Sequence, residues 1–417
     1  MTKDKDIICS FCGNKINRKD IKEGKSKVFI GTDEDIVICE NCVQQCVDIM
    51  SKDSKKELSQ EIENFYPSEI KTHLDKWIIG QEEAKKTLAI ALYNHYKRIN
   101  QVCSEEDKIQ KSNVMLVGHT GSGKTALVEA LARIAGLPLV IEDVTSISTT
   151  GYIGRDVDDI LKNLLMKADG DIKKAQRGIV LLDEGDKLKR EKNGNGQRDV
   201  KGEGVQQSLL KMVEGGVFDV KVNGHKTRKF DTRNVLFILS GAFENIDKII
   251  EGRIKESSNV GSTGFTGNVD ARTESQKYND LIVQVKHEDL KKFGMMPELL
   301  GRFPVVTAVQ ELSEEALKDI LVKPKNAIVK QYKELFAEDD VDLEFSDEAL
   351  LAIAKEAKKR KIGARALRSI LEEVLKKPMF EVPGNEEVDS VVIDKDLNAQ
   401  YLKKELEQED LEEETNI

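Results

Sequence analysis

The chain has 417 residues, of which 39% are hydrophobic and 34% charged, an ordinary composition for a soluble globular protein long enough for two or three domains. Lysine and arginine total 65 against 75 aspartates and glutamates, and the net charge of −10 argues against nucleic acid as the main partner. No apolar run reaches membrane-spanning length, and the first residues lack the apolar stretch of a signal peptide. We therefore expect a cytoplasmic protein without a membrane partner, in which cysteines serve as thiols or metal ligands.

Two Cys-x₂-Cys pairs stand within the first 50 residues, Cys9 with Cys12 and Cys39 with Cys42. This pattern is typical of a tetrahedral Cys₄ zinc site. The 26-residue spacer between the pairs is longer than usual. Lengthening such a loop from about 18 residues costs only about 0.3 kcal/mol, whereas structural zinc supplies on the order of 10 kcal/mol. We expect a zinc-binding domain over residues 1–50, with reduced, unmetallated thiols as the alternative.

The spacer itself has the pattern of a hairpin, with strands at 27–30 and 36–38, which would return Cys39 to the side of Cys12. Cys46 follows on a predicted helix and is expected to be a small core residue rather than a fifth ligand. Cys103 is expected to be structural or incidental. The polar stretch 51–64 is poor in core-forming residues and is predicted to be a linker.

From residue 65 to residue 309, short apolar runs alternate with amphipathic helices, the pattern of a parallel α/β sheet. The runs 113–117, 178–182 and 234–239 suit buried parallel strands. The segments 190–204 and 252–278 are rich in Gly, Lys, Asn and Ser, and are predicted to be loops.

Residues 310–400 are predicted to form a smaller, mainly helical domain. Ser313 and Ser346 each precede acidic residues and an apolar period, as helix N-caps do. A short strand is expected at 388–393, followed by an acidic tail over 401–417.

A phosphate-binding motif, GHTGSGKT, runs from Gly118 to Thr125 and fits the pattern GxxxxGK[ST]. It follows a predicted strand directly and precedes a helix over 126–135 closed by Gly136, which is the context that the motif requires. Backbone N–H groups would wrap the phosphates of ATP, Lys124 would reach the β and γ phosphates, and Thr125 would hold Mg²⁺. The residues expected at ATP are Gly118, His119, Thr120, Gly121, Ser122, Gly123, Lys124, Thr125 and Ala126.

An acidic pair, Asp183 and Glu184, ends the second apolar run. Together with the phosphate-binding motif it has the Walker B arrangement. Asp183 would hold the Mg²⁺ shell and Glu184 would activate the attacking water. A dedicated water-activating glutamate favours an ATP hydrolase over a kinase.

Further segments carry a family resemblance: IGQEEAKK at 79–86, YNHYKR at 93–98, RDVKGEGVQQ at 198–207, FGMMPELLGRFPVV at 293–306 and IGARALR at 362–368. With the cysteines and both Walker segments, they make the chain similar to the ClpX family of hexameric AAA+ unfoldases, which feed the ClpP peptidase. The likeness extends from the N-terminal cysteines to about residue 393. HslU relatives share several of these segments but lack the zinc domain, so the cysteines favour ClpX.

The resemblance implies roles for single residues. Arg302 would be the arginine finger that reaches the nucleotide of a neighbouring subunit, which implies a closed hexamer. Arg365 would be the sensor 2 residue that couples the small domain to the γ phosphate. Ile78 and Ile79 would line the adenine pocket, and Ser240 is a candidate for sensor 1.

The resemblance also implies a substrate-gripping pore. The segment Gly151-Tyr152-Ile153-Gly154 corresponds to the family's pore loop, in which an aromatic side chain between glycines grips a polypeptide by apolar contact. Residues 198–200 stand where a second pore loop is expected.

The chain departs from the family at three places. Thr263-Gly264-Phe265 stands where members that dock to ClpP carry an aliphatic residue, glycine and phenylalanine. The threonine hydroxyl would have to be desolvated, so docking is weakened, altered or redirected to a different peptidase. In the segment 225–230, Phe230 takes the place of a histidine in a loop that selects substrate tails. His119 replaces a proline at a permissive position.

The sequence therefore predicts a zinc-binding domain, an AAA+ P-loop parallel α/β domain and a small, mainly helical α+β domain. ATP hydrolysis would drive the Tyr152 loops of a homo-hexamer to pull tagged or unfolded substrates, delivered with adaptors, into a ClpP-type peptidase. Two alternatives keep the motor but change the partner: a remodelling chaperone that works alone, and an HslU-like partner of an HslV-type peptidase. The third alternative is a zinc-bearing nucleic-acid remodeller, and the excess of acidic over basic residues argues against it.

Overall fold

A computed structural model describes most of the chain, and its residues fall into two compact units, Met1–Asn64 and Phe65–Ile417. The described residues are 7–16, 21, 27–30, 36–46, 66–100, 109–147, 157–189, 200–222, 226–258, 272–385 and 387–403. Within these ranges, no helix is long and apolar enough to cross a membrane.

The described residues of the first unit include two small antiparallel ribbons and a helix that follows the second ribbon. The first ribbon pairs β1 (Ile7–Ile8) with β2 (Lys15–Ile16), and the second pairs β3 (Val28–Ile30) with β4 (Val37–Cys39). A helix over 40–46 follows directly. The predicted hairpin in the spacer is thus confirmed, and Val28 lies opposite Cys39 in its register.

The second unit is built on a parallel sheet of five strands in the order β11-β5-β10-β7-β6. The strands are β5 (Val114–Val117), β6 (Leu139–Asp143), β7 (Ile179–Asp183), β10 (Leu236–Gly241) and β11 (Val305–Ala308). The three apolar runs predicted as buried strands are β5, β7 and β10. They are apolar on both sides because helices cover both faces of the sheet.

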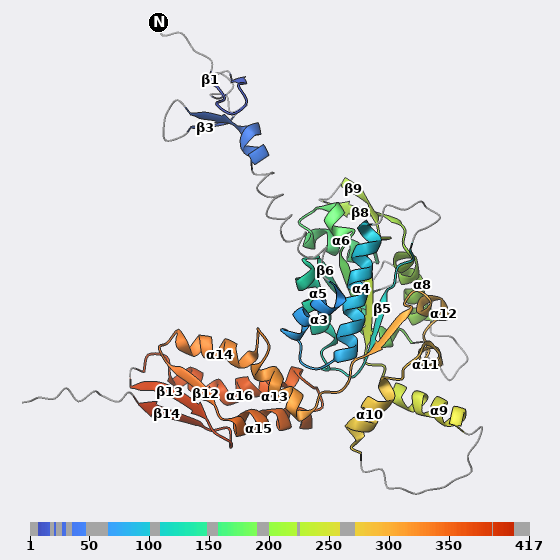
Figure 1. Cartoon of the computed structure of the whole chain (residues 1–417), viewed down its shortest axis with the longest axis vertical. Helices are drawn as coiled ribbons and strands as arrows, with labels where there is room; N and C mark the ends of the chain where they lie inside the picture. The colour runs from blue at the N-terminus through green and yellow to red at the C-terminus, as the bar shows by residue number, and fades with distance from the viewer. Residues whose placement is uncertain are drawn as a thin grey trace, which may run out of the picture. The chain divides into compact units, whose positions relative to one another are not determined.

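Alternate residues of each strand face opposite layers. Val114 and Leu116 pack with α3, α4 and α5, whereas Met115 and Val117 pack with α6, α8, α9 and α12 (Figure 1). The bounds of the first set are α3 (Pro67–Asp75), α4 (Glu82–Asn100) and α5 (Lys124–Ala135). Those of the second are α6 (Val157–Lys167), α8 (Val200–Glu214), α9 (Ile246–Ser258) and α12 (Pro297–Leu300). The remaining elements of this domain are η2 (Val144–Ser146), α7 (Ile172–Ala175), η3 (Gly185–Leu188), β8 (Val217–Val222), β9 (Lys226–Asp231), α10 (Glu274–Ile282) and α11 (His287–Phe293).

Two of the predicted loops are shorter than the composition indicated. Helix α8 already begins at residue 200, α9 continues to residue 258, and α10 begins at residue 274. Buried Ile246 and Ile250 give α9 an apolar period that outweighs its interior glycine. At the start of α10, the Thr273 hydroxyl accepts from the backbone N–H of Gln276, whose side chain accepts from that of Thr273.

The prediction of a substrate-selecting loop at 225–230 is corrected in part. Residues 226–231 form β9, which pairs antiparallel with β8 and places Phe230 opposite Phe218. The Phe230 side chain is fully buried in the core of this domain. Position 230 therefore belongs to the core of this domain and not to an exposed loop.

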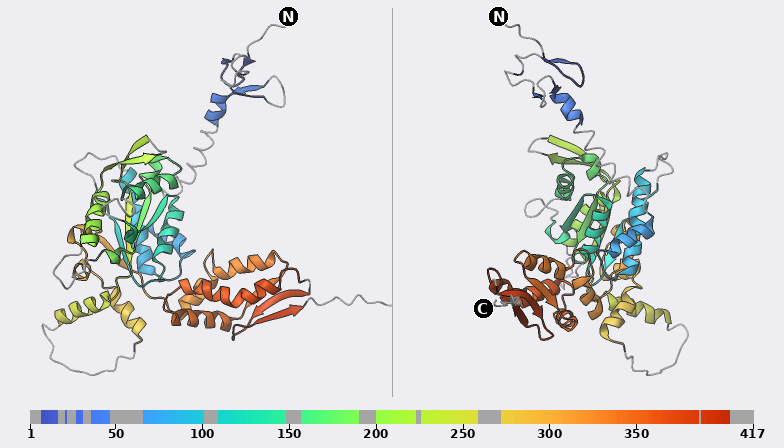
Figure 2. Two further views of the ribbon diagram at one scale, coloured as in Figure 1. Left: turned by 180° about the vertical axis from the view of Figure 1, so that it is seen from behind. Right: turned by 60° about the vertical axis from the view of Figure 1, so that its left-hand side comes forward.

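The small domain has one apolar core of its own, enclosed by four helices and three strands (Figure 2). Its helices are α13 (Glu314–Val322), α14 (Ile328–Ala337), α15 (Asp347–Lys359) and α16 (Arg365–Glu381), and its strands are β12 (Asp342–Phe345), β13 (Val388–Ile393) and β14 (Ala399–Lys403). Strand β13 lies parallel to β12 and antiparallel to β14. The predicted strand at 388–393 and both N-caps are confirmed: the hydroxyls of Ser313 and Ser346 each accept from a backbone N–H three residues on, at 3.1 Å.

Candidate ATP site and metal centre

The phosphate-binding motif forms the turn between β5 and α5. Gly121 and Gly123 have positive φ angles of 77° and 99°, and α5 begins at Lys124. Gly136 closes that helix in the left-handed conformation, as predicted. Because the first turn of a helix has free backbone N–H groups and the positive end of the dipole, this turn is suited to anions.

Lys124 is buried at the base of the turn. Its ammonium group donates to the carbonyl oxygens of Gly118 at 2.6 Å and His119 at 2.9 Å. Burial lowers the pKa of Lys124 to about 8, while the nearby carboxylates Asp183 and Asp186 partly oppose that shift. A phosphate group bound in the turn would supply the anionic partner that restores the charged form.

Asp183 gathers three donors at the carboxyl end of β7. Its carboxylate accepts from the hydroxyl of Thr125 at 3.2 Å, from that of Ser240 at 2.5 Å and from the backbone N–H of Glu184 at 3.0 Å. Thr125 is the second residue of α5, and Ser240 lies on β10, the strand between β5 and β7. Thr125 and Ser240 are 58 and 57 residues away from Asp183 in the sequence, and the fold brings both into direct contact with it.

Glu184 stands at the exposed end of β7 with a left-handed backbone, φ 58°. This conformation is costly for a residue with a side chain, and such residues cluster at functional sites. The side chain of Glu184 is exposed to solvent.

The phosphate-binding turn touches the small domain through two glycines. The backbone N–H of Ala364 donates to the carbonyl of Gly121 at 3.0 Å. A Cβ atom at position 121 would lie 2.0 Å from the carbonyl oxygen of Ile362, and one at position 363 would lie 2.5 Å from that of Gly121. Only glycine permits this approach, which places the start of α16, with Arg365, at the turn. The positive charge of Arg365 further lowers the pKa of Lys124.

Two matches with known protein families bear on this arrangement. Residues 109–306 match the AAA domain (Cdc48 subfamily), which includes the phosphate-binding turn and the Asp183–Glu184 pair. The chain is an AAA+ ATPase. Residues 312–393 match the C-terminal, D2-small domain, of ClpB protein, so the ATPase is of the Clp/Hsp100 type.

The other residues expected at the ATP site of this ATPase lie at separate places. Ile78 and Ile79 are half-buried in the turn between α3 and α4, where Ile78 packs against the core of that face. Arg302 follows α12, and its guanidinium donates to the carboxylate of Glu214, at the end of α8, at 2.5 Å. Its backbone carbonyl accepts from Asn113. Neither of these partners belongs to the phosphate-binding turn.

Two groups of predicted residues lie outside the described part of the chain. They are the pore-loop residues Gly151, Tyr152, Ile153 and Gly154, and the docking residues Thr263, Gly264 and Phe265. Cys103 and residues 198–199 also lie outside it.

The sequence analysis of this ATPase missed several residues at the site. Asp186 is buried and accepts from the backbone N–H of Ala242 at 3.0 Å, which links η3 to the end of β10. Tyr278 of α10 stacks on His119 of the turn, with ring centroids 3.9 Å apart and planes 25° from parallel. Gln81 donates to the carbonyl of Ser122 at 3.1 Å. Asp186 and Tyr278 carried no local signal, whereas Gln81 stands in one of the segments that carried the family resemblance.

The four predicted zinc ligands converge in the first unit. The sulfur atoms of Cys9, Cys12, Cys39 and Cys42 all lie within 4.8 Å of one another, with Cys9–Cys42 at 3.9 Å and Cys12–Cys39 at 3.8 Å. A tetrahedral site with Zn–S bonds of about 2.3 Å has sulfur atoms about 3.8 Å apart, so the cluster fits the metal. Backbone N–H groups of Cys12 and Cys39 lower the pKa of the Cys9 thiol to about 6, which favours the thiolate that zinc binds. Cys46 does not belong to this cluster.

Proposed function

We propose that this AAA+ ATPase is an ATP-dependent protein unfoldase that translocates polypeptides through the pore of a homo-hexameric ring. The observation that carries the proposal is the contact of the phosphate-binding turn with the turn before Arg365. Through this contact a change at the phosphates can move the small domain, which is what a motor requires.

Each residue of the site has a role in this proposal. Lys124 and the N–H groups at the start of α5 bind the phosphates, and Thr125 and Asp183 offer the hard oxygen ligands that Mg²⁺ prefers. When bound, Mg²⁺ neutralises charge that develops on the phosphates. Glu184 orients the attacking water and takes its proton, while the Ser240 hydroxyl holds the Asp183 carboxylate in position.

Two arginines complete the charge stabilisation that we propose. Arg365 approaches the γ phosphate from the small domain of the same subunit, and Arg302 reaches the nucleotide of the neighbouring subunit. The half-exposed guanidinium of Arg302, paired with Glu214, supports this assignment because such a surface ion pair is weak and easily exchanged for a phosphate. Ile78 and Ile79 supply the apolar walls for adenine.

In this proposal the first unit is a zinc-binding domain over 1–50 with Cys9, Cys12, Cys39 and Cys42 as ligands, joined by the linker 51–64. Residues 65–309 form the large ATPase domain, 310–400 the small domain, and 401–417 an acidic tail. The zinc domain would recruit substrates or adaptors, and the Gly151–Gly154 loop, through Tyr152, would grip the polypeptide.

The finer proposal is a specificity subunit of a Clp protease in the cytoplasm, docked through Thr263, Gly264 and Phe265. The stand-alone chaperone and the HslU-like subunit remain as alternatives for the partner, not for the motor. Saturable, nucleotide-dependent binding to a ClpP-type peptidase from the same cell, lost in Phe265→Ala, is the expected result. A hexamer that hydrolyses ATP without binding that peptidase would contradict the docking role and favour the stand-alone chaperone.

The motor itself is tested by unfolding of a tagged, stably folded fluorescent protein. We expect loss of fluorescence that requires ATP. Glu184→Gln should bind ATP with unchanged affinity but hydrolyse it at least about 100-fold more slowly, since general base catalysis contributes about 10²–10⁴. Tyr152→Ala should hydrolyse ATP yet fail to unfold the substrate. Normal turnover in the first variant, or normal unfolding in the second, would overturn the role assigned to that residue.

A further inference from the structure

The chain leaves the large domain through the junction Val309–Glu311, directly after strand β11. The backbone N–H of Val309 donates to the carbonyl of Val117 at 2.7 Å, which extends the β11–β5 ladder by one residue. The N-cap of α13, Ser313, opens the first helix of the small domain two residues after Glu311. The orientation of the small domain therefore depends on what holds these three residues.

Gln81 holds the middle residue of the junction. Its side-chain amide donates to the carbonyl of Gln310 at 2.8 Å, and its side-chain oxygen accepts from the backbone N–H of Gln310 at 2.9 Å. The same amide also donates to the carbonyl of Ser122 in the phosphate-binding turn at 3.1 Å. One buried carboxamide thus ties the turn that receives phosphate to the exit of the large domain.

Asn279 holds the next residue, Glu311, in the same way. Its side-chain amide donates to the carbonyl of Glu311 at 3.1 Å, and its oxygen accepts from the backbone N–H of Glu311 at 2.7 Å. Asn279 belongs to α10, whose neighbouring Tyr278 stacks on His119 of the phosphate-binding turn. At both Gln310 and Glu311, a side-chain carboxamide therefore forms hydrogen bonds with the backbone N–H and with the backbone carbonyl.

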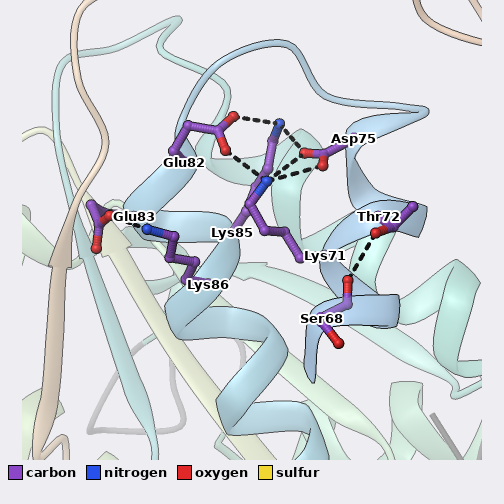
Figure 3. A network of polar contacts seen from close by, with 8 residues as sticks. All are labelled: Ser68, Lys71, Thr72, Asp75, Glu82, Glu83, Lys85 and Lys86. Carbon is purple, nitrogen blue, oxygen red and sulfur yellow. Dashed lines mark hydrogen bonds and ion pairs between the residues drawn. The ribbon is translucent and has the colours of Figure 1, made fainter. Parts of the chain in front are cut away.

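The turn that carries Gln81 has a rigid base. Two lysines and two acids connect α3 with α4: Lys71 and Lys85 each pair with both Asp75 and Glu82, at 2.6 to 3.3 Å (Figure 3). The Lys85 side chain is only 2% exposed. Because Asp75 and Glu82 flank the turn, this network fixes both of its ends. Gln81 itself has a left-handed backbone, φ 60°, which a loose turn would not retain.

We propose that Gln81 and Asn279 are positioning residues that fix the junction relative to the phosphate-binding turn. Movement between the two domains then begins after Glu311, and the position of Ser122 is transmitted to the small domain through Gln81. This inference rests on the assignment of the 118–125 turn as the ATP site. It predicts different kinetic effects for the two residues, because only Gln81 touches the turn.

The test uses near-isosteric variants of the full-length protein, Gln81→Glu and Asn279→Asp. Each keeps the oxygen that accepts from the junction and replaces the donating amide by an oxygen that faces a carbonyl. The matched control is Gln284→Glu, at an exposed carboxamide that follows α10 and donates to the backbone carbonyl of Asp280. Hydrogen exchange of the backbone amides of residues 310 and 311 is measured without nucleotide, followed by steady-state ATPase kinetics.

We expect amide exchange at the junction to accelerate at least about tenfold in both variants and to stay unchanged in the control, since each variant replaces a donated hydrogen bond by a carboxylate oxygen that faces the junction carbonyl. Gln81→Glu should raise the KM for ATP about tenfold or more and lower kcat, whereas Asn279→Asp should lower kcat with little change in KM. Unchanged junction exchange in both variants would overturn the proposal, as would equal effects of both on KM. If Gln81→Glu does not fold, Asn279→Asp, at a half-exposed site, provides the test, through hydrogen exchange of the same backbone amides at residues 310 and 311. Because that exchange is measured without ATP, failure of the unfoldase proposal would not alter it.

Discussion

His95 of α4 shows how a single buried polar side chain with a specific partner affects the stability of this ATPase. Its Nε2 atom lies 3.1 Å from the carbonyl of Arg177, to which the neutral ring donates. Burial lowers the pKa of His95 to about 3, and the charges of Arg98 and Lys111 act in the same direction. The folded protein therefore keeps this imidazole neutral under conditions in which an unfolded chain, with a histidine pKa of about 6.5, binds a proton.

This difference predicts acid sensitivity. The contribution of His95 to the free energy of unfolding is fully present above pH 6.5. It is lost as the pH falls from about 6.5 towards 3, because only the unfolded state then gains the proton. Between pH 7 and pH 5 the loss is about 2 kcal/mol. His95→Gln, which retains a donor for Arg177, should be less stable than the wild type at pH 7 but should lose less stability on acidification.

The measurement is urea unfolding of the ATPase unit at both pH values. The matched control is His73→Gln, at a half-exposed histidine of α3. An unchanged pH dependence in His95→Gln would show that other groups cause the acid sensitivity.

Among elements, the contact between the phosphate-binding turn and the start of α16 depends on a glycine from each side. Gly363→Ala introduces a Cβ atom 2.5 Å from the carbonyl of Gly121, at a φ of 59° that also disfavours alanine. We expect α16 to shift away from the turn with Arg365, and the ATPase rate to fall about tenfold or more, because a positioned positive charge is lost from the transition state. Steady-state ATPase assays check this.

Gly252→Ala is the matched control, since Gly252 lies inside α9 and a Cβ there meets nothing within 4 Å. That variant should keep its ATPase rate and gain about 0.5–1 kcal/mol of stability from helix propensity. A Gly363→Ala protein with the wild-type ATPase rate would contradict the proposed role of the contact.

The sequence predicted the elements whose signal is local. Strands β5, β7 and β10 are continuous apolar runs, Ser313 and Ser346 are caps that act within three residues, and the P-loop motif contains its own turn chemistry. The parallel α/β sheet followed from these signals, whereas the AAA+ class followed from the family resemblance. The junction clamps could not be predicted, because Gln81 and Gln310 are 229 residues apart and a lone glutamine has no local pattern. Composition failed at α9 and α10, where apolar periodicity and a capping box outweigh polar content.

For the molecule as a whole, the division into two compact units predicts two separate responses to metal removal. Among the described residues of the first unit, the buried apolar side chains are those of Cys9, Val37 and Cys42, so we expect this unit to fold only with zinc in the cysteine cluster. A strong chelator should release one zinc per chain and abolish the structure of residues 7–16 and 36–46, seen as rapid amide exchange there. The thermal transition of residues 65–417 and the basal ATPase rate should not change.

Cys12→Ser should reproduce the effect of the chelator, and Cys46→Ser, outside the cluster, should not. Protection of residues 7–16 and 36–46 that survives zinc removal would instead support the unmetallated thiols.

The hydrogen bond from Ala364 to Gly121 has a thermodynamic consequence for an assembled ring. Coupling between two sites is reciprocal: if ATP at the turn biases the position of the small domain, then any ligand that fixes the small domain alters ATP affinity by the same factor. A neighbouring subunit docked on the small domain would be such a ligand. Subunits of identical sequence would then bind ATP with unequal affinities whenever their small domains are held differently. Hydrolysis in an ordered sequence around the ring would need no further signal.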